Sequence, residues 1–401
     1  MTSGPRTGPR TGPKPRVILL GSGELSGELV IALRRLGATV AAVDSYAGAP
    51  AHRVADQALV IPLTDATALL QAARRLQPDF VVINTDVLTP DVLDALDAPA
   101  GLAGPAGGPH VVPGARAVRL TADREGMRTL AADELGLPVA PFWFAGSVNE
   151  LESAAAHAGF PLLVQPVGPA AGGRGSVVTG PETLGPAWRR AGTSRVLVER
   201  VVDVEVLVTL LAVRTEAPGG PAIEFCSPIG HLGLDADVPQ SWQPQHLSPA
   251  ATDSARSIAA RIVKVLGGRG VFGIELMVNG DEVYFAGVTS RPLGSAWVTV
   301  CSQRLSAFEL QARAILGLPV DTMMASPAAA RAVPWDSNGV APTAWALSGA
   351  LRVPESDVRL FHRPDMRRTL GVTLATGPEV DVARERAQRA AAALAVPHSR
   401  G

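Results

Sequence analysis

The stretch Val17-Ile-Leu-Leu-Gly-Ser-Gly-Glu-Leu25 decides how the chain begins to fold. Its apolar run is short enough for a buried strand, and Gly21-Ser-Gly23 supplies a tight turn into the helical pattern of Glu24 to Leu36. A second apolar run, Ala38 to Val43, follows and closes on Asp44. This order of strand, glycine loop, helix, strand and acid is typical of a doubly wound parallel sheet.

Further strand and helix patterns extend this first domain. The sequence predicts a helix over Ala66–Leu76, a strand over Phe80–Ile83 and a helix over Pro90–Leu96, and the Gly/Pro/Ala-rich segment Pro99–Pro113 ends the domain. Parallel strands present ligands beyond their carboxyl ends. We therefore expect Gly21–Leu25 and Asn84–Asp86 to share one edge of the sheet.

The pattern changes after Thr121, where antiparallel strands are expected. Gly270–Met277 and Glu282–Ala286 read as two strands joined at Asn279-Gly-Asp281, a hairpin turn signal. The remaining predicted elements are helices over Asp123–Leu135, Leu305–Leu316 and Val380–Leu394, a strand over Phe160–Pro166, a strand-rich segment over Arg195–Leu211, an irregular linker over Pro319–Pro342, and short strands between Thr343 and the last helix.

Composition excludes several classes of protein. The 401 residues are 47% hydrophobic and 18% charged, which suits two or three packed domains. The formal net charge of −1 attracts neither nucleic acid nor an anionic membrane, and no apolar run reaches the roughly 18 residues of a membrane span. Residues 1–15 are expected to form a disordered tail rather than a signal peptide. Cys226 and Cys301 stand far apart, which favours a reduced, cytoplasmic location.

Five blocks carry a closer resemblance: Leu20-Gly-Ser-Gly-Glu-Leu25, Ala41-Ala-Val-Asp44, Leu120-Thr-Ala-Asp-Arg-Glu-Gly126, Ser241-Trp-Gln-Pro-Gln245 and Gly270-Val-Phe-Gly-Ile-Glu-Leu276. In this order they resemble the formate-dependent phosphoribosylglycinamide formyltransferases of the ATP-grasp superfamily. The resemblance implies an α/β protein with a Rossmann-like N-terminal domain over 16–118, a central ATP-grasp (α+β) domain over 119–318 and a small C-terminal domain over 319–401, usually as a homodimer. It also implies that ATP with Mg²⁺ phosphorylates formate to formyl phosphate, which the phosphoribosylglycinamide amine then attacks.

The resemblance assigns binding residues but leaves the catalytic residues unknown. It places the ribonucleotide at Glu24, Leu25, Asn84, Arg363 and Arg368, and Mg²⁺ at Glu275. It places ATP at Arg124, Gln165, Gly173, Arg174, Gly175, Ser176, Glu199, Arg200, Val201 and Val202.

Residue chemistry supports these assignments and also offers plainer alternatives. Glu24 and Leu25 begin a helix, where backbone N–H groups favour an anion, although the glycine turn alone would also suit a tight bend. Arg124 could hold phosphate with two hydrogen bonds or be a solvated charge. Glu199 could belong to a nucleotide-binding hinge or face water at a strand end. Glu275 interrupts an apolar strand, so a metal ion or a salt bridge is expected beside it.

Several positions depart from the family pattern. Gln165 stands where the family has Lys, Leu207 and Gly287 where it has Glu, Asn84 for another Glu, and Gly294 for Asp. In electrostatic sites of this kind each lost group typically lowers the rate by about 10²–10³. Three functions therefore remain open: the family reaction, a catalytically impaired nucleotide-binding relative that acts as a scaffold or sensor, or an ATP-grasp ligase with another acid or amine.

Overall fold

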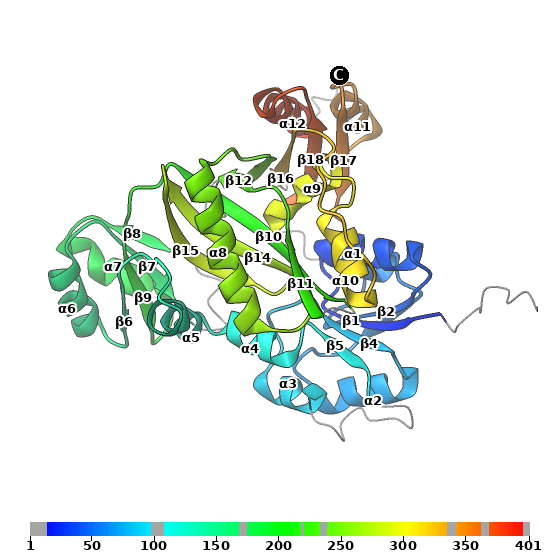
Figure 1. Cartoon of the computed structure of the whole chain (residues 1–401), viewed down its shortest axis with the longest axis horizontal. Helices are drawn as coiled ribbons and strands as arrows, with labels where there is room; N and C mark the ends of the chain where they lie inside the picture. The colour runs from blue at the N-terminus through cyan, green and yellow to red at the C-terminus, as the bar shows by residue number, and fades with distance from the viewer. Residues whose placement is uncertain are drawn as a thin grey trace, which may run out of the picture.

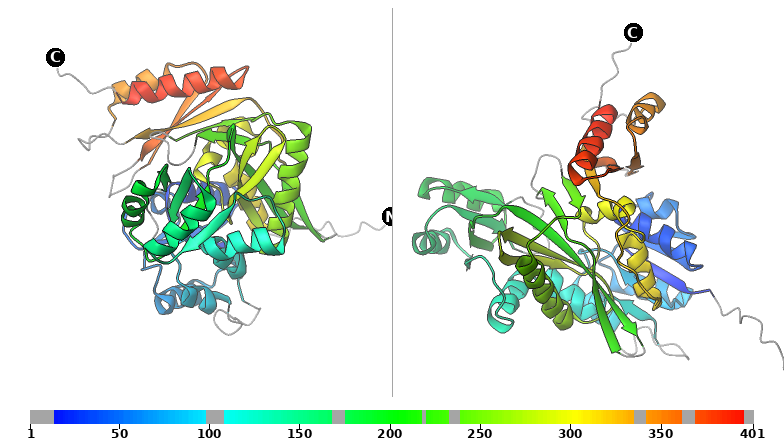
Figure 2. Two further views of the ribbon diagram at one scale, coloured as in Figure 1. Left: turned by 90° about the vertical axis from the view of Figure 1, so that its left-hand side faces the viewer. Right: turned by 45° about the horizontal axis from the view of Figure 1, so that its top comes forward.

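A computed structural model describes residues 14–97, 108–167, 175–217, 220–232, 239–334, 342–361 and 369–395. Within these ranges the strands form three sheets, and Figure 1 shows the smallest of them projecting at one end of the molecule with α6 and α7. The helices at the C-terminal end lie at another extremity, away from that small sheet (Figures 1 and 2). No helix in the described ranges is both long and apolar enough to cross a lipid bilayer.

The N-terminal sheet is parallel and buried on both faces. Its order is β3-β2-β1-β4-β5. Val17 and Leu19 of β1 pack toward α1 and α10, whereas Ile18 and Leu20 pack toward α2, α3 and α4. Burial on both sides explains the continuous apolar runs. The elements are β1 (Arg16–Leu20), α1 (Glu24–Arg35), β2 (Thr39–Asp44), η1 (Pro50–Arg53), β3 (Gln57–Val60), α2 (Ala66–Leu76), β4 (Phe80–Ile83), α3 (Pro90–Asp97), β5 (His110–Val112) and α4 (Ala115–Ala122).

The small sheet has the order β6-β9-β7-β8 and is antiparallel. Apolar side chains of α6 and α7, among them Leu151 and Leu184, pack together on it. The elements of this part are α5 (Arg124–Thr129), η2 (Leu130–Glu134), β6 (Phe142–Ala145), α6 (Val148–Ala158), β7 (Leu162–Pro166), β8 (Ser176–Val178), η3 (Pro181–Thr183), α7 (Leu184–Ala191) and β9 (Val196–Arg200).

The largest sheet is antiparallel and has nine strands, in the order β15-β14-β10-β12-β13-β16-β18-β17 with β11 also paired to β10. Its elements are β10 (Val206–Ala217), β11 (Gly220–Phe225), β12 (Ile229–Leu232), β13 (Gln240–Gln243), α8 (Pro249–Leu266), β14 (Gly270–Asn279), β15 (Glu282–Thr289), η4 (Gly294–Val298), α9 (Thr299–Ser302), α10 (Ala307–Leu316), β16 (Ala328–Pro334), α11 (Ala344–Leu351), β17 (Ser356–Leu360), β18 (Thr369–Thr376) and α12 (Val380–Leu394).

The two faces of the large sheet have different neighbours. Leu210 and Ile274 lie in the cluster that includes α8, while Leu211 and Val271 lie in the cluster that includes η4 and α10. Because side chains alternate along a strand, Thr209 shares the face of Leu211, and Glu275 shares the face of Val271. The acidic side chain expected to hold a metal therefore lies on the face opposite α8.

The structure corrects several sequence predictions. The irregular linker predicted over Pro319–Pro342 contains β16, which pairs with β13 and β18. Pro99–Pro113 contains β5, which pairs with β4. The predicted helix over Asp123–Leu135 is α5 followed by a wider π-helical turn, η2. The helix α11 was not predicted at all. The division at residue 319 stays a prediction, although one sheet runs across it.

Candidate active site

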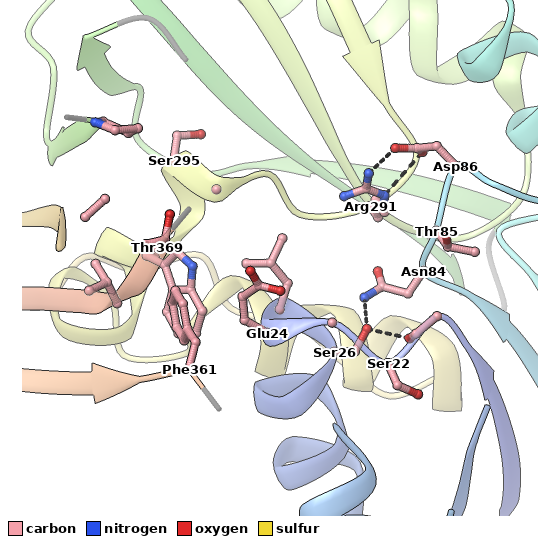
Figure 3. Close-up of a pocket in the computed structure, with 18 of the residues that line it drawn as sticks. Ser22, Glu24, Ser26, Asn84, Thr85, Asp86, Arg291, Ser295, Phe361 and Thr369 are labelled. Atoms are coloured by element: carbon pink, nitrogen blue, oxygen red, sulfur yellow. Dashed lines mark hydrogen bonds and ion pairs between the residues drawn. The ribbon is translucent and has the colours of Figure 1, made fainter. Parts of the chain in front are cut away.

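A cavity of about 660 Å³ lies where the N-terminal sheet, the large sheet and the C-terminal strands meet. Glu24, Asn84 and Asp86 line it from the N-terminal side, and Arg291 and Ser295 line it from the β15–η4 segment (Figure 3). Gly21–Leu25 and Asn84–Asp86 therefore share one edge, which confirms the prediction made from parallel strands. Phe361 and Thr369 contribute to the C-terminal wall.

The turn after β1 is fixed by its backbone. Gly21 has a φ of +91°, and a Cβ there would lie 2.7 Å from Thr85 Cβ and 2.9 Å from the Asn84 carbonyl oxygen. Ser26 Oγ donates a hydrogen bond of 2.7 Å to the Gly21 carbonyl, and Asn84 Nδ2 donates one of 2.6 Å to Ser26 Oγ (Figure 3). This chain of hydrogen bonds fixes the Asn84 side-chain amide at the edge of the cavity. Its Oδ1 can act as an acceptor, since no hydrogen bond within the described ranges involves that atom.

Asp44, the acid that closes β2, supports this turn and does not act as a free group. Its Oδ2 accepts a hydrogen bond from the Ser22 N–H at 2.7 Å, and its Oδ1 accepts one from the Ser45 N–H at 2.7 Å. The side chain is 8% exposed.

Arg291 and Asp86 form an ion pair in the wall of the cavity (Figure 3). Arg291 Nε lies 3.4 Å from Asp86 Oδ1, and Nη2 contacts Oδ2. The pair joins the segment after β15 to the segment after β4. Sequence reasoning did not single out Asp86 as a partner, because the two residues lie 205 positions apart.

Glu199 is buried inside β9 and does not face water from a strand end. Its Oε1 lies 2.5 Å from Nη2 of Arg128, and the two side chains are 8% and 7% exposed. Arg128 also donates to the carbonyl oxygens of Phe285 at 2.8 Å and Ala286 at 3.1 Å. Burial raises the pKa of Glu199, and the guanidinium groups of Arg128 and Arg124 oppose that rise.

The chain after Glu199 connects the small sheet to the large one. Arg200 ends β9, and β10 begins at Val206. The N–H of Arg200 donates to the Pro141 carbonyl at 2.9 Å, and that of Val201 donates to the Pro161 carbonyl at 3.2 Å. The Val201 side chain is exposed, and that of Val202 is half-buried. These residues are therefore placed as a link between two sheets, as a hinge requires.

Glu275 lies on β14 directly opposite Gly287 of β15, beside a β-bulge. A Cβ at Gly287 would lie 3.3 Å from Glu275 Oε2, so the two positions expected to carry a pair of metal ligands do face each other. Burial raises the pKa of Glu275, and Arg124 opposes the rise. Among the described residues, no ion pair involves the Glu275 carboxylate, so the salt bridge considered from sequence has no partner in this part of the chain.

Of the remaining residues predicted to bind the nucleotide, some are described by the structure and others are not. Gln165 lies on β7, and a Cβ at Gly175 would lie 3.1 Å from its Cγ, so these two adjoin. Ser176 Oγ accepts a hydrogen bond of 2.9 Å from Arg190 of α7. Gly173 and Arg174, like Arg363 and Arg368 on the ribonucleotide side, lie outside the described residues.

Comparison with known proteins gives the family. Residues 130–308 match the ATP-grasp domain, and residues 337–394 match the family described as "PurT, C-terminal". A formate-dependent phosphoribosylglycinamide formyltransferase of Paraburkholderia xenovorans (strain LB400) is 45% identical over 391 residues, which cover 94% of this chain and 95% of that protein. One of Burkholderia pseudomallei (strain 668) is 46% identical over 392 residues, with the same coverage.

Solved structures agree with this result. The glycinamide-RNase-transformylase T of Mycobacterium tuberculosis is 59% identical, with a TM-score of 0.81 over 94% of this chain and 99% of that one. The N5-carboxyaminoimidazole ribonucleotide synthetase of Thermotoga maritima has a TM-score of 0.78 at 21% identity over 94% of this chain and 98% of that one, and shares the fold alone. The chain belongs to the formate-dependent phosphoribosylglycinamide formyltransferases of the ATP-grasp superfamily.

Proposed function

We propose that this chain formylates phosphoribosylglycinamide with formate and ATP in purine biosynthesis, through formyl phosphate. The observation that carries the proposal is the position of the cavity. The strand ends of the Rossmann-like sheet meet the β15–η4 segment there, and Ser295 of the cavity wall is hydrogen-bonded at 2.8 Å to Thr209, the residue beside Glu275 in the large sheet. An acid activated near Glu275 would thus be close to an amine held in the cavity.

The ribonucleotide is proposed to bind along the N-terminal edge. Glu24 and Leu25 open α1, whose N–H groups favour an anionic group, and Asn84 presents a fixed acceptor beside them. Arg363 and Arg368 are proposed as further phosphate contacts on the strength of the resemblance. Beside Gly294 the cavity is open, since a Cβ at this position would meet no atom within 4 Å.

ATP is proposed to lie between the small and the large sheet. Arg124, which begins α5, acts electrostatically on both Glu199 and Glu275, so it lies near the proposed hinge and the proposed metal ligand. Gln165, the segment Gly173–Ser176 and the backbone of Glu199–Val202 would complete the nucleotide site. A guanidinium can hold phosphate oxygens with two hydrogen bonds, which an amide such as Gln165 does with less charge.

Glu275 fits a magnesium ion that arrives bound to ATP. The residue as a whole is half-buried, and no hydrogen bond among the described residues involves its carboxylate. The described residues contain no group of three or more metal-ligating side chains, so a cage made by the protein alone is not formed there. Mg²⁺ commonly takes one or two carboxylates and completes its shell with phosphate oxygens and water. When bound, the ion would neutralise phosphate charge, while Glu275 positions it.

Titration calorimetry with Mg–ATP, followed by an ADP-release assay, tests the proposal. We expect nucleotide binding, and ADP release that depends on both formate and phosphoribosylglycinamide. Binding with release that needs a different acid would select another ligase, and binding without release would select a nucleotide-binding scaffold or sensor. Glu275→Ala is expected to abolish the Mg²⁺ dependence of nucleotide affinity, whereas an unchanged affinity with and without Mg²⁺ would make Glu275 structural.

We also propose a homodimer in the cytoplasm. The proposal rests on the family resemblance and on Cys226 and Cys301, both free thiols, which suit a reducing compartment. Light scattering coupled to size exclusion tests the dimer, and a monomer at micromolar concentration would contradict it.

A further inference from the structure

His231 is a buried histidine in the wall of the cavity, and it is not among the residues proposed to bind ATP, Mg²⁺ or the ribonucleotide. It lies on β12, is 8% exposed and lines the cavity. Its Nε2 is buried, and in the part of the chain that the structure describes no group forms a hydrogen bond with it. Leaving such a nitrogen unpaired costs about 1–3 kcal/mol, which a bound partner would offset.

The protonation state of the His231 ring allows its Nε2 to accept a proton. Burial lowers the pKa of His231, and a hydrogen bond with the Leu232 backbone opposes that effect. Because Nε2 has no partner, the backbone bond belongs to Nδ1, and a bond that raises the pKa is one in which the ring donates. Burial thus favours the neutral imidazole, and a ring that donates from Nδ1 to the Leu232 carbonyl carries its lone pair on Nε2.

The elements that pack against β12 bring no charge to this ring. Leu207 of β10 and Ser241 of β13 lie directly opposite His231, on the same face of the large sheet. The short helix η4 (Gly-Ser-Ala-Trp-Val), which also packs on β12, has no titratable group. The charged side chains of the described cavity wall, Glu24, Asp44, Asp86 and Arg291, come from other segments.

The position of His231 suits a step that follows acid activation. Glu275 is paired with Thr209 of β10, and His231 is paired with Leu207, which lies two residues before Thr209 on the same face. Two strand spacings and a two-residue step separate the backbones of His231 and Glu275 by about 12 Å. The ring is thus on the cavity side of the site and not beside the proposed metal.

We propose that His231 accepts the proton from the amine of phosphoribosylglycinamide during formyl transfer. This inference rests on the proposed function. The amine lone pair forms the C–N bond to the formyl carbon, the bond from that carbon to the phosphate oxygen breaks, and phosphate leaves with the electron pair. The amine proton passes to His231 Nε2, so atoms and charge balance without another reactant.

His231→Gln tests this role, with the exposed His246→Gln as the matched control. We expect His231→Gln to lower kcat for formyl transfer by about 10²–10⁴. Formation of enzyme-bound ADP from ATP and formate, followed in a single turnover without the ribonucleotide, should stay within about twofold, because the nucleotide and acid sites are untouched. His246→Gln should leave both rates unchanged. Equal losses in both reactions, or retention of transfer, would overturn the proposal.

A measurement on the unaltered protein removes dependence on how the variant folds. In the unaltered protein, kcat for transfer should fall as the pH is lowered below about 6.5, because protonated His231 cannot accept the proton of the amine. The fall should follow the titration of a single group. That limb should be absent in His231→Gln. A flat profile for the unaltered protein would contradict the inference, whereas no formate-dependent turnover at all would remove the proposed function itself.

Discussion

Arg128→Met removes the cation that holds three parts of the molecule together. In the structure its guanidinium pairs with Glu199 of β9 at 2.5 Å and donates to the carbonyl oxygens of Phe285 and Ala286 in β15. The variant keeps an apolar side chain of similar length, so the loss is mainly one of charge and hydrogen bonds. It leaves Glu199 buried without its nearest partner, and such a carboxyl takes up a proton.

The loss of folding stability in Arg128→Met can be worked out from the protonation of Glu199. Holding Glu199 neutral at pH 7 when its ordinary pKa is 4.5 costs about 3.4 kcal/mol, at about 1.36 kcal/mol for each pH unit. This agrees with the roughly 3–5 kcal/mol expected when one partner of a buried pair is removed. The variant's Glu199 is protonated when folded and ionised when unfolded. Its penalty therefore grows as pH rises above about 4.5 and disappears below it.

Urea unfolding of the unaltered protein and the variant at pH 5 and pH 7.5 measures this penalty. We expect Arg128→Met to lose more stability at pH 7.5 than at pH 5, by at most about 3 kcal/mol, because the raised pKa of Glu199 gives the unaltered protein part of the same penalty. Arg195→Met is the control, since its ion pair with Glu125 is solvent-exposed and should matter little. Adding Glu199→Gln to Arg128→Met should recover part of the loss. A loss that does not vary with pH, or a double variant equal to the sum of the two singles, would refute the reasoning.

Two other variants test the edges of the site. Gly287→Glu should place a second carboxylate beside Glu275. Without metal it should lower Tm, and with Mg²⁺ it should tighten ATP binding by about tenfold or more. The same response to Mg²⁺ from Gly287→Gln would show that the facing positions do not share an ion. Gly21→Ala should destabilise the fold by about 1–3 kcal/mol and weaken ribonucleotide binding, because the new alanine Cβ would clash with Thr85 and Asn84. A Tm equal to that of the unaltered protein would contradict this.

The fold could be predicted where a pattern is local. β4 and α12 lie where their periodicity placed them, because each buries a regular apolar set along a single element. β5 and β16 were missed for the opposite reason. β5 has three residues in a Gly/Pro/Ala-rich segment, and β16 is mostly alanine, so each becomes a strand through pairing with distant partners.

The site divides in the same way. The edge formed by Gly21 and Asn84 follows from strand order and could be predicted. The environment of Glu199 could not, because its partner Arg128 lies on another element and burial depends on how the sheets meet. His231 gave no signal in the sequence, where a single histidine in an apolar strand is most often part of the core. Its unpaired Nε2 and its place in the cavity wall exist only in three dimensions.

The continuity of the nine-stranded sheet has a consequence for synthesis of the chain. β13 ends at Gln243, and the strand that covers its outer edge, β16, begins only at Ala328. While the ribosome makes the intervening residues, at about 5–20 residues per second, that edge is bare and able to recruit a strand from another nascent chain. A gene fragment that stops before β16 should therefore yield insoluble protein, even though it encodes the whole segment from β6 to β15.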